Sequence, residues 1–274
     1  MRKHILPGVF ICAAISCTTP QKEYQSITTP TGQWELVWND EFDYTGLPDS
    51  ARWSYDTHGN SWGWGNNEQQ HYTAANPENA YVSNGILSIT ALKKQTEDKP
   101  YSSARLITKE KGDWLYGRFE IRAKLPSARG TWPAIWMLPT DWEYGGWPAS
   151  GEIDIMENVG YDPDTILATA HTQKYNHILG TQTSGKLAIP TCATQFHTYS
   201  LEWDEHEWRA YIDEMHYYTH KNEGDSASWP FDKRFHLILN LAIGGNWGGK
   251  YGIDDSGFPH TMEVDYVRVY QKIK

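Results

Sequence analysis

Residues 151–160, GEIDIMENVG, contain three carboxylates at a spacing that a regular strand cannot place on one face. Glu152 and Asp154 lie two residues apart, as neighbours on one strand face do, but Glu157 lies three positions after Asp154. Strict alternation would bury Glu157 among apolar side chains, and an unpaired buried carboxylate is costly. We therefore predict a β-bulge at residues 155–156, because one extra residue returns Glu157 to the acidic face.

The spacing of these acids is compatible with glycoside hydrolysis. With one residue absorbed by the bulge, about four rises of roughly 3.3 Å separate Glu152 from Glu157, so inclined side chains bring the carboxyl groups to about 5 to 7 Å. This range includes the roughly 5 to 5.5 Å of retaining glycosidases, and its upper end reaches the inverting class. Crowding would raise the pKa of these carboxyl groups, as a general acid requires. A solvated acidic face and a divalent cation site are the alternatives.

The remaining chain predicts a single all-β domain over residues 33–274. Short runs of β-forming residues recur between turn residues, for example WELVW, YGRFEIRAKL, FHLILNLAI and EVDYVRVYQ. Within residues 263–271, alternation predicts one face with Val264, Tyr266, Arg268 and Tyr270 and another with Asp265, Val267 and Val269. Without long amphipathic helices or a break in composition, this pattern favours an antiparallel sandwich of two sheets with a concave, aromatic-lined face.

The N-terminal residues predict export. Residues 1–17 have a basic start, a short apolar stretch and small residues before Cys17, which is typical of a signal peptide and too short for a membrane span. The residues before Cys17 resemble a bacterial lipoprotein cleavage site, so we expect a lipid anchor there, with ordinary secretion as the alternative. Residues 18–32 are polar, contain two prolines and are expected to form a linker.

The net charge and the cysteine content exclude several classes of ligand and binding site. The net charge is −10, and removal of the signal peptide takes away two basic residues and no acidic ones. Nucleic acid and anionic polysaccharides would be repelled, whereas a neutral ligand would not. Cys12 and Cys17 lie in the signal segment and Cys192 is alone, so no disulfide framework or cysteine-based metal site is expected. A monomer is the default expectation.

The acidic stretch also carries a family resemblance. E-I-D-I-M-E, with one residue inserted before the last Glu, resembles the signature of glycoside hydrolase family 16 in its bulged, laminarinase-like form. The lichenase-like and xyloglucan-acting branches usually have the shorter E-x-D-x-E. Further segments resemble the family in the same order: WNDEF, NNEQQHY, YGRFEIRAKLP, GTWPAIWMLP, FHTYSLEWD, NLAIGGNWGG and MEVDYVRVYQ. The resemblance implies a β-jelly roll with a substrate cleft across its concave sheet.

By this resemblance, Glu152 is the nucleophile and Glu157 is the general acid and then the general base. Asp154 is expected to bond the nucleophile and tune its protonation. The implied reaction retains the anomeric configuration.

Several other residues are candidates for contact with sugar. Trp132 and Trp136 lie four residues apart on one face of a predicted strand and could stack on pyranose rings, with core packing as the alternative. His171 ends a neighbouring strand and could bond Glu157 or the substrate, although a lone strand histidine is more often structural. By resemblance, the remaining cleft contacts are Asn67, Glu68, Arg105, Trp147, Asn246 and Trp247.

A structural calcium ion is the one bound group that the resemblance suggests. Glu41, the carbonyl of Gly85 and Asp265 match the positions that hold this ion on the convex side of family members. Alternatively, both carboxylates bond backbone groups at strand ends. No cofactor is expected for catalysis.

The sequence thus predicts an exported, retaining endo-glycosidase acting on β-1,3-glucan, on mixed-linkage β-1,3-1,4-glucan, or on both. Two alternatives remain open at this stage. One is a non-catalytic glucan-binding lipoprotein, and the other is a hydrolase of the same family for another polysaccharide. Charge disfavours carrageenan but permits neutral agarose.

Overall fold

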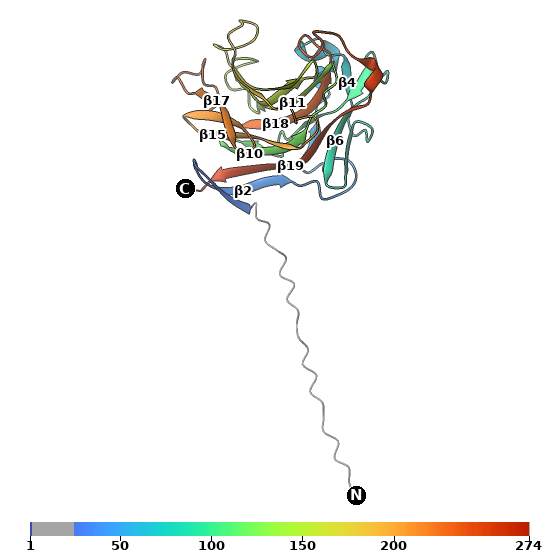
Figure 1. Cartoon of the computed structure of the whole chain (residues 1–274). Coiled ribbons are helices and arrows are strands. Elements are labelled where there is room, and N and C mark those ends of the chain that lie inside the picture. The colour runs from blue at the N-terminus through green and yellow to red at the C-terminus, as the bar shows by residue number, and fades with distance from the viewer. Residues whose placement is uncertain (2–24, 274) are drawn as a thin grey trace.

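The computed structural model describes Met1 and residues 25–273 as two large antiparallel sheets that stack on one another (Figure 1). The nine-stranded sheet contains β1 (Ser26–Thr29), β2 (Gly32–Asp40), β5 (Ala80–Ser83), β6 (Ile86–Ala91), β10 (Gly117–Lys124), β15 (His197–Trp203), β16 (Glu207–Ile212), β17 (Met215–Lys221) and β19 (His260–Lys272). The eight-stranded sheet contains β3 (Ser54–Tyr55), β8 (Arg105–Ile107), β9 (Asp113–Trp114), β11 (Thr131–Pro139), β12 (Glu152–Val159), β13 (Asp162–His171), β14 (Thr183–Ala188) and β18 (Phe235–Ile243).

The curled sheets form the predicted β-jelly roll, and the shorter elements lie around them (Figure 1). β4 (Gln70–Tyr72) and β7 (Tyr101–Ser103) form a small parallel pair. The remaining elements are two 3-10 segments, η2 (His58–Gly65) and η3 (Asp255–Gly257). Within residues 25–273, no helix has the length and apolar character needed to cross a membrane.

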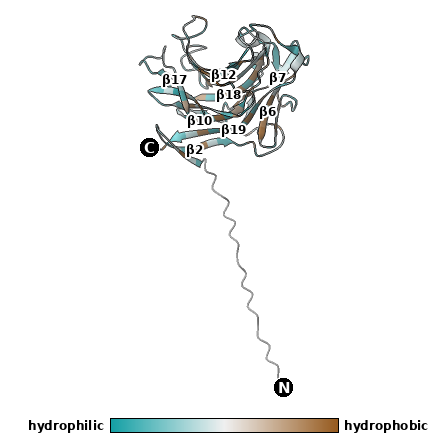
Figure 2. Cartoon of the chain, in the orientation of Figure 1, coloured by the Kyte–Doolittle hydropathy of each residue, from teal (hydrophilic) through white to brown (hydrophobic). Residues whose placement is uncertain are grey.

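Apolar side chains fill the space between the two sheets. β12 contributes Ile153, Ile155 and Met156, all without solvent exposure, and β10 contributes Phe119 and Ile121 from the opposite sheet. Every residue of β18 is buried, because one face of this strand packs in the core and the other lies beneath cleft side chains. Figure 2 shows the hydrophobic character of β6, whose Leu87 and Ile89 also join the core.

The folded domain begins earlier than the sequence predicts. β1 lies within the expected linker, residues 18–32, and pairs with β2 at the edge of the nine-stranded sheet. Its side chains are exposed or half-buried, so it adds almost nothing to the core that an apolar pattern could reveal. Polar contacts fix it instead, since the Thr29 hydroxyl donates to Glu202 and accepts from the Trp34 indole. The linker prediction is therefore wrong for residues 26–32.

The alternation predicted for residues 263–271 is also interrupted. Val264 and Val267 are both fully buried although they are three residues apart. A register shift explains this, because Arg122 and Ala123 of β10 pair with Tyr266 and Val264 and leave Asp265 unpaired in the ladder. Both valines thus face the core. The expected export segment, residues 1–17, and Cys17 within it lie outside the described residues, apart from Met1.

Candidate active site

The predicted bulge in β12 is confirmed and places the three acids together. Adjacent residues of β11 pair with Asp154 and Met156, which leaves Ile155 between them without a partner. On the other side of β12, residues 155–156 together oppose a single residue of β13. Because Ile155 and Met156 both point into the core, Glu157 returns to the face that carries Glu152 and Asp154.

Two indole groups hold the outer acids of this row. Trp147 donates a hydrogen bond from Nε1 to Glu152 Oε2 at 2.8 Å, and Trp132 donates to Glu157 Oε1 at 3.0 Å. Asp154 between them is 2 % exposed, and its Oδ2 atom has no hydrogen-bond partner among the described residues. The two glutamates are therefore stabilised as anions by donors that Asp154 lacks.

Burial raises the pKa of all three carboxyl groups. For Glu152 the charge of Glu157 adds to the effect of burial, and the Trp147 indole opposes it. The pKa of Asp154 is raised well above its ordinary range, by burial and then by both glutamates. A protonated Asp154 beside Glu152 lowers the pKa of Glu152 and so favours its anion. The pKa of Glu157 is raised by burial, as a proton donor near neutral pH requires.

His171 contacts different acids from the one considered in the sequence analysis. It pairs with Glu152 across the β12–β13 ladder, and its Nε2 atom lies 3.4 Å from Asp154 Oδ2 and 3.7 Å from Glu152 Oε1. Burial, together with the charge of His177, lowers its pKa to about 4, so the ring is neutral at neutral pH. His171 thus lies at the Glu152 end of the row, and within the described residues no hydrogen bond joins it to Glu157.

A cavity of about 540 Å³ opens above the acidic row. Five of the predicted contact residues line it: Glu68, Arg105, Trp132, Trp136 and Trp147. Trp132 and Trp136 therefore share the cleft face, as their spacing predicts. His171, Asn67, Asn246 and Trp247 do not line it. Asn67 and Asn246 bond each other at 2.8 Å, and Trp247 packs edge-on against Trp132 with ring centroids 5.3 Å apart.

One wall of the cavity is built around Arg105. Its guanidinium lies 4.3 Å from the ring centroid of Trp64 and 4.7 Å from that of Trp136, and its Nε is 3.1 Å from Asp56 Oδ2. Glu68 is also buried there, and burial raises its pKa although Gln70 bonds it. The wall therefore offers a flat aromatic surface with paired charges, which suits an uncharged polar ligand.

Several lining residues were not predicted from the sequence. They are Asp56, His58, Trp62, Trp64, Asn66, Trp142, His177, Ile178 and Asn240. The dense aromatic run W-G-W at residues 62–64 was a possible signal. Asn240 lies within a fully buried strand, where only the structure reveals that it accepts a hydrogen bond from Trp136.

The predicted calcium ligands do not fit a cation site as they are arranged. Both carboxylate oxygens of Glu41 accept hydrogen bonds from Arg268, at 2.9 and 2.8 Å, and Asp265 is ion-paired with Arg122. A calcium ion would have to displace both guanidinium groups, whereas calcium prefers a shell of oxygen atoms. Gly85 lies in the turn between β5 and β6. A different group of residues, Glu152, Asp154 and His171, offers ligand atoms within 4.8 Å of one another and could hold a divalent ion.

Comparison with known proteins agrees with this geometry. The sequence model of the glycosyl hydrolases family 16 matches residues 38–268. A β-glucanase from Rhodothermus marinus is 54% identical over 249 residues, which cover 88% of this chain and 86% of that protein.

Two solved structures are similar throughout. The laminarinase from Rhodothermus marinus superposes with a TM-score of 0.86 at 54% identity, over 88% of this chain and 98% of that one. SCLam, a non-specific endo-β-1,3(4)-glucanase, gives a TM-score of 0.85 at 47% identity, over 90% and 94% of the two chains. Because the family model and a relative of more than half identity both span most of the sequence, this chain belongs to glycosyl hydrolase family 16.

Proposed function

We propose that the protein is a retaining endo-hydrolase of β-1,3-glucan that also cleaves mixed-linkage β-1,3-1,4-glucan. The observation that carries this proposal is the bulge in β12, which places Glu152 and Glu157 on one face beneath a cavity lined by indole rings. The similar proteins named above are a laminarinase and an endo-β-1,3(4)-glucanase, which supports the same substrates. Glucanases of this family need no catalytic cofactor.

The proposed reaction has two steps. Glu152 attacks the anomeric carbon and the bond to the leaving chain breaks, while Glu157 gives its proton to the departing oxygen. Glu157 then takes a proton from water, whose oxygen attacks the anomeric carbon and releases Glu152. The Trp132 indole favours the ionised Glu157 that this second step requires. Asp154 supports the ionised Glu152 before the first step and after the second.

The product profile tests this proposal. Laminarin and mixed-linkage glucan are incubated separately with the purified domain, and early products are followed by anomeric NMR and by size. We expect β-anomeric oligosaccharides of intermediate length from both polymers, and none from a Glu152→Gln control. Early α-anomers would contradict retention.

The same assay separates the alternatives. Glucan binding without hydrolysis by the wild type would identify a capture protein. Hydrolysis of agarose alone would identify another neutral substrate. The intact row of three acids argues against a pure binding protein, because burying carboxyl groups costs folding free energy that binding alone does not require.

We also propose export with a lipid anchor at Cys17. The supporting observation is the sequence of residues 1–17, with its basic start, its apolar stretch and a cysteine after small residues. In a bacterial host, the full chain should partition into the detergent phase, and Cys17→Ala should move it to the aqueous phase. Equal partitioning of the two proteins would support ordinary secretion.

A further inference from the structure

The cavity covers only part of the concave sheet. Its lining includes residues of β8, β11, β12 and β18 but, among the described residues, none of β13 or β14, although these two strands continue the same sheet. Glu157 pairs with Leu167 of β13, and Leu167 pairs with Lys186 of β14. An endo-acting enzyme holds sugar on both sides of the cleaved bond. The loop that joins β13 to β14 closes the cavity at His177 and Ile178, so a glucan chain that passes Glu157 would leave the cavity beside the start of β13.

An aromatic surface lies beside this open half of the sheet. Trp247 packs edge-on against Trp132, whose indole bonds Glu157, and the Trp247 indole lies close enough to the Tyr161 hydroxyl to act against the rise that burial causes in the pKa of Tyr161. Tyr161 meets Tyr251 with ring centroids 4.8 Å apart and planes at 84°. We call Trp247, Tyr161 and Tyr251 the aromatic shelf.

The aromatic shelf is exposed at Tyr251 and half-buried at Trp247 and Tyr161, and the surrounding turns fix its position. Tyr251 is 59 % exposed, so one face of its ring is free for a ligand while Tyr161 packs against the ring. A Cβ atom on Gly160, next to Tyr161, would lie 1.7 Å from the carbonyl oxygen of Ala128, so this turn packs directly against the segment that leads into β11. A Cβ atom on Gly248 would lie 2.9 Å from Cβ of Trp132. Both tyrosine-bearing loops are thus anchored to the strand that carries Trp132.

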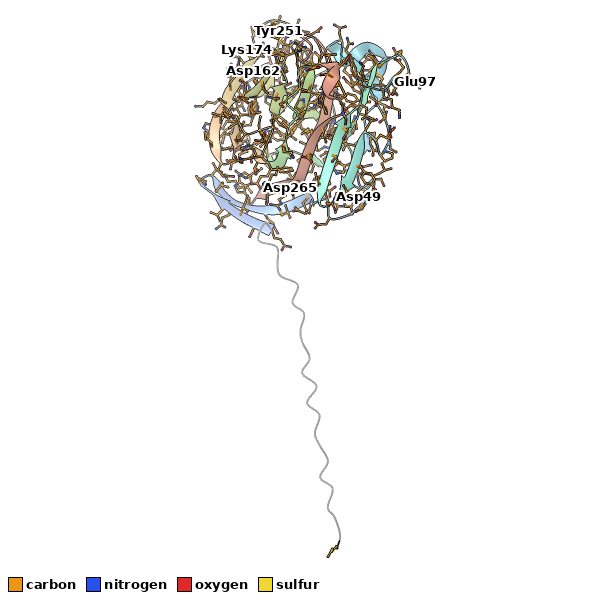
Figure 3. The ribbon with its side chains drawn as sticks, turned by 45° about the vertical axis from the view of Figure 1, so that its right-hand side comes forward. Asp49, Glu97, Asp162, Lys174, Tyr251 and Asp265 are labelled. Atoms are coloured by element: carbon orange, nitrogen blue, oxygen red, sulfur yellow. The ribbon has the colours of Figure 1, made fainter. Side chains whose placement is uncertain are left out.

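The position of Tyr251 is visible in Figure 3, where it lies at the end of the molecule opposite Asp265. Lys250 places its ammonium 5.3 Å from the Tyr251 ring centroid and provides a hydrogen-bond donor beside the ring. A pyranose ring has an apolar face that matches an aromatic ring and hydroxyl groups that match such a donor. Aromatic rings are also tolerant of sequence and linkage, since they contact the sugar face without reading individual hydroxyl groups.

We propose that the aromatic shelf is a second sugar-binding site, which holds the part of a β-glucan chain that has passed the acidic row and left the cavity beside the start of β13. This inference rests on the proposed function for the identity of the sugar. Such a site would make the enzyme selective for long chains, because a short oligosaccharide would occupy the cavity without reaching Tyr251.

Direct binding tests this inference without turnover. In a Glu152→Gln background, the affinities for a β-1,3-linked trisaccharide and octasaccharide are measured with and without Tyr251→Ala. We expect Tyr251→Ala to weaken octasaccharide binding by about three- to tenfold, as expected for loss of one stacking contact. Trisaccharide binding should be unchanged. Tyr251→Phe should bind like the parent, because the ring is retained.

A matched control comes from the other sheet. Met215 on β17 is 56 % exposed, so Met215→Ala removes a comparably exposed side chain far from the acids and should leave both affinities unchanged. Equal octasaccharide affinity with and without Tyr251→Ala would overturn the inference, whatever the wild type hydrolyses. Absence of glucan hydrolysis by the wild type would instead overturn the proposed function, and length-dependent binding through Tyr251 would then still identify the shelf as a glucan site.

Discussion

Two clusters of buried carboxylates lie on opposite sheets and differ in what surrounds them. On the eight-stranded sheet, Glu152, Asp154 and Glu157 have indole donors and a neutral histidine, and burial raises the pKa of each. On the nine-stranded sheet, Glu120 and Glu202 bond the guanidinium of Arg118, which the exposed Glu214, in the turn between β16 and β17, also contacts.

The Arg118 guanidinium opposes the effect of burial on the pKa of Glu202. Burial alone would raise the pKa of Glu202, but hydrogen bonds from Thr31 and Arg118 lower it overall. One cluster therefore holds protons that a reaction can use, and the other holds fixed charges that join strands β10 and β15. The comparison teaches that grouped acids become reactive where the fold withholds a cation, and structural where it supplies one.

The largest effect should come from removing the nucleophile in the first cluster. Glu152→Gln keeps the shape and the Trp147 contact but cannot form a glycosyl-enzyme, so we expect kcat on laminarin to fall by about 10³-fold or more. Initial rates of reducing-sugar release measure this. Glu120→Gln, in the second cluster, is the matched control and should keep most of the wild-type kcat. A similar loss of kcat in both variants would contradict the distinction between the clusters.

Removing the cation should have the next largest effect, and it should affect stability. Arg118 is 1 % exposed, and Arg118→Met removes the nearer of the two guanidinium groups that pair with Glu202, which is 2 % exposed, and leaves the more distant Arg209 at 3.4 Å. We expect the free energy of unfolding to fall by about 3–5 kcal/mol, measured by urea denaturation. Arg234→Met removes an exposed partner of Asp141 and should cost less than about 1 kcal/mol. Comparable losses in both variants would show that Arg118 is not the centre of its cluster.

A smaller effect should appear in the pH profile when one indole donor is removed. Trp132→Phe deletes the hydrogen bond that favours ionised Glu157, so the pKa of Glu157 should rise. The alkaline limb of kcat/KM should then move to higher pH by about one unit, since a charge-assisted hydrogen bond is worth about 1.5–3 kcal/mol. Trp136→Phe is the control, because its indole donates to Asn240 and, among the described residues, makes no hydrogen bond to a carboxylate of the row. An unchanged limb in Trp132→Phe would mean that another group sets it.

Of the two bulges, the one in β12 could be predicted from the sequence and the one in β19 could not. The bulge in β12 was predictable because regular alternation would bury the charge of Glu157. The bulge in β19 gave no such signal, since Asp265 and Tyr266 are each acceptable on a surface and Val264 and Val267 both fit a core. Only the ladder with β10 reveals it.

The same reasoning applies to the binding residues and the domain boundary. Trp132 and Trp136 were predictable from strand spacing, but Trp64 comes from the kinked segment η2, and Trp142 and His177 come from loops, whose course no periodicity encodes. β1 was missed because hydroxyl groups fix this edge strand where apolar side chains usually would. The sequence therefore predicts what alternation and the cost of buried charge decide, and it misses what loop geometry and polar contacts decide.

The smallest expected effect concerns stability at the active site. The pKa of Glu152 is raised on folding, so its contribution to stability is fully present below the pKa of an unfolded glutamate and is lost as the pH rises through the higher folded value. Glu152→Gln has no proton to lose at that site. Its melting temperature should therefore exceed that of the wild type by about 2–4 °C at alkaline pH, which corresponds to about 1 kcal/mol in a chain of this size. The difference should shrink toward pH 4, where both side chains are neutral.

In the Arg118 cluster the sign reverses, because the pKa of Glu202 is lowered and its stabilisation is lost as the pH falls. Scanning calorimetry of Glu152→Gln and Glu202→Gln across pH should thus give differences from the wild type of opposite sign at alkaline pH, and equal signs would show that the two clusters do not differ in protonation.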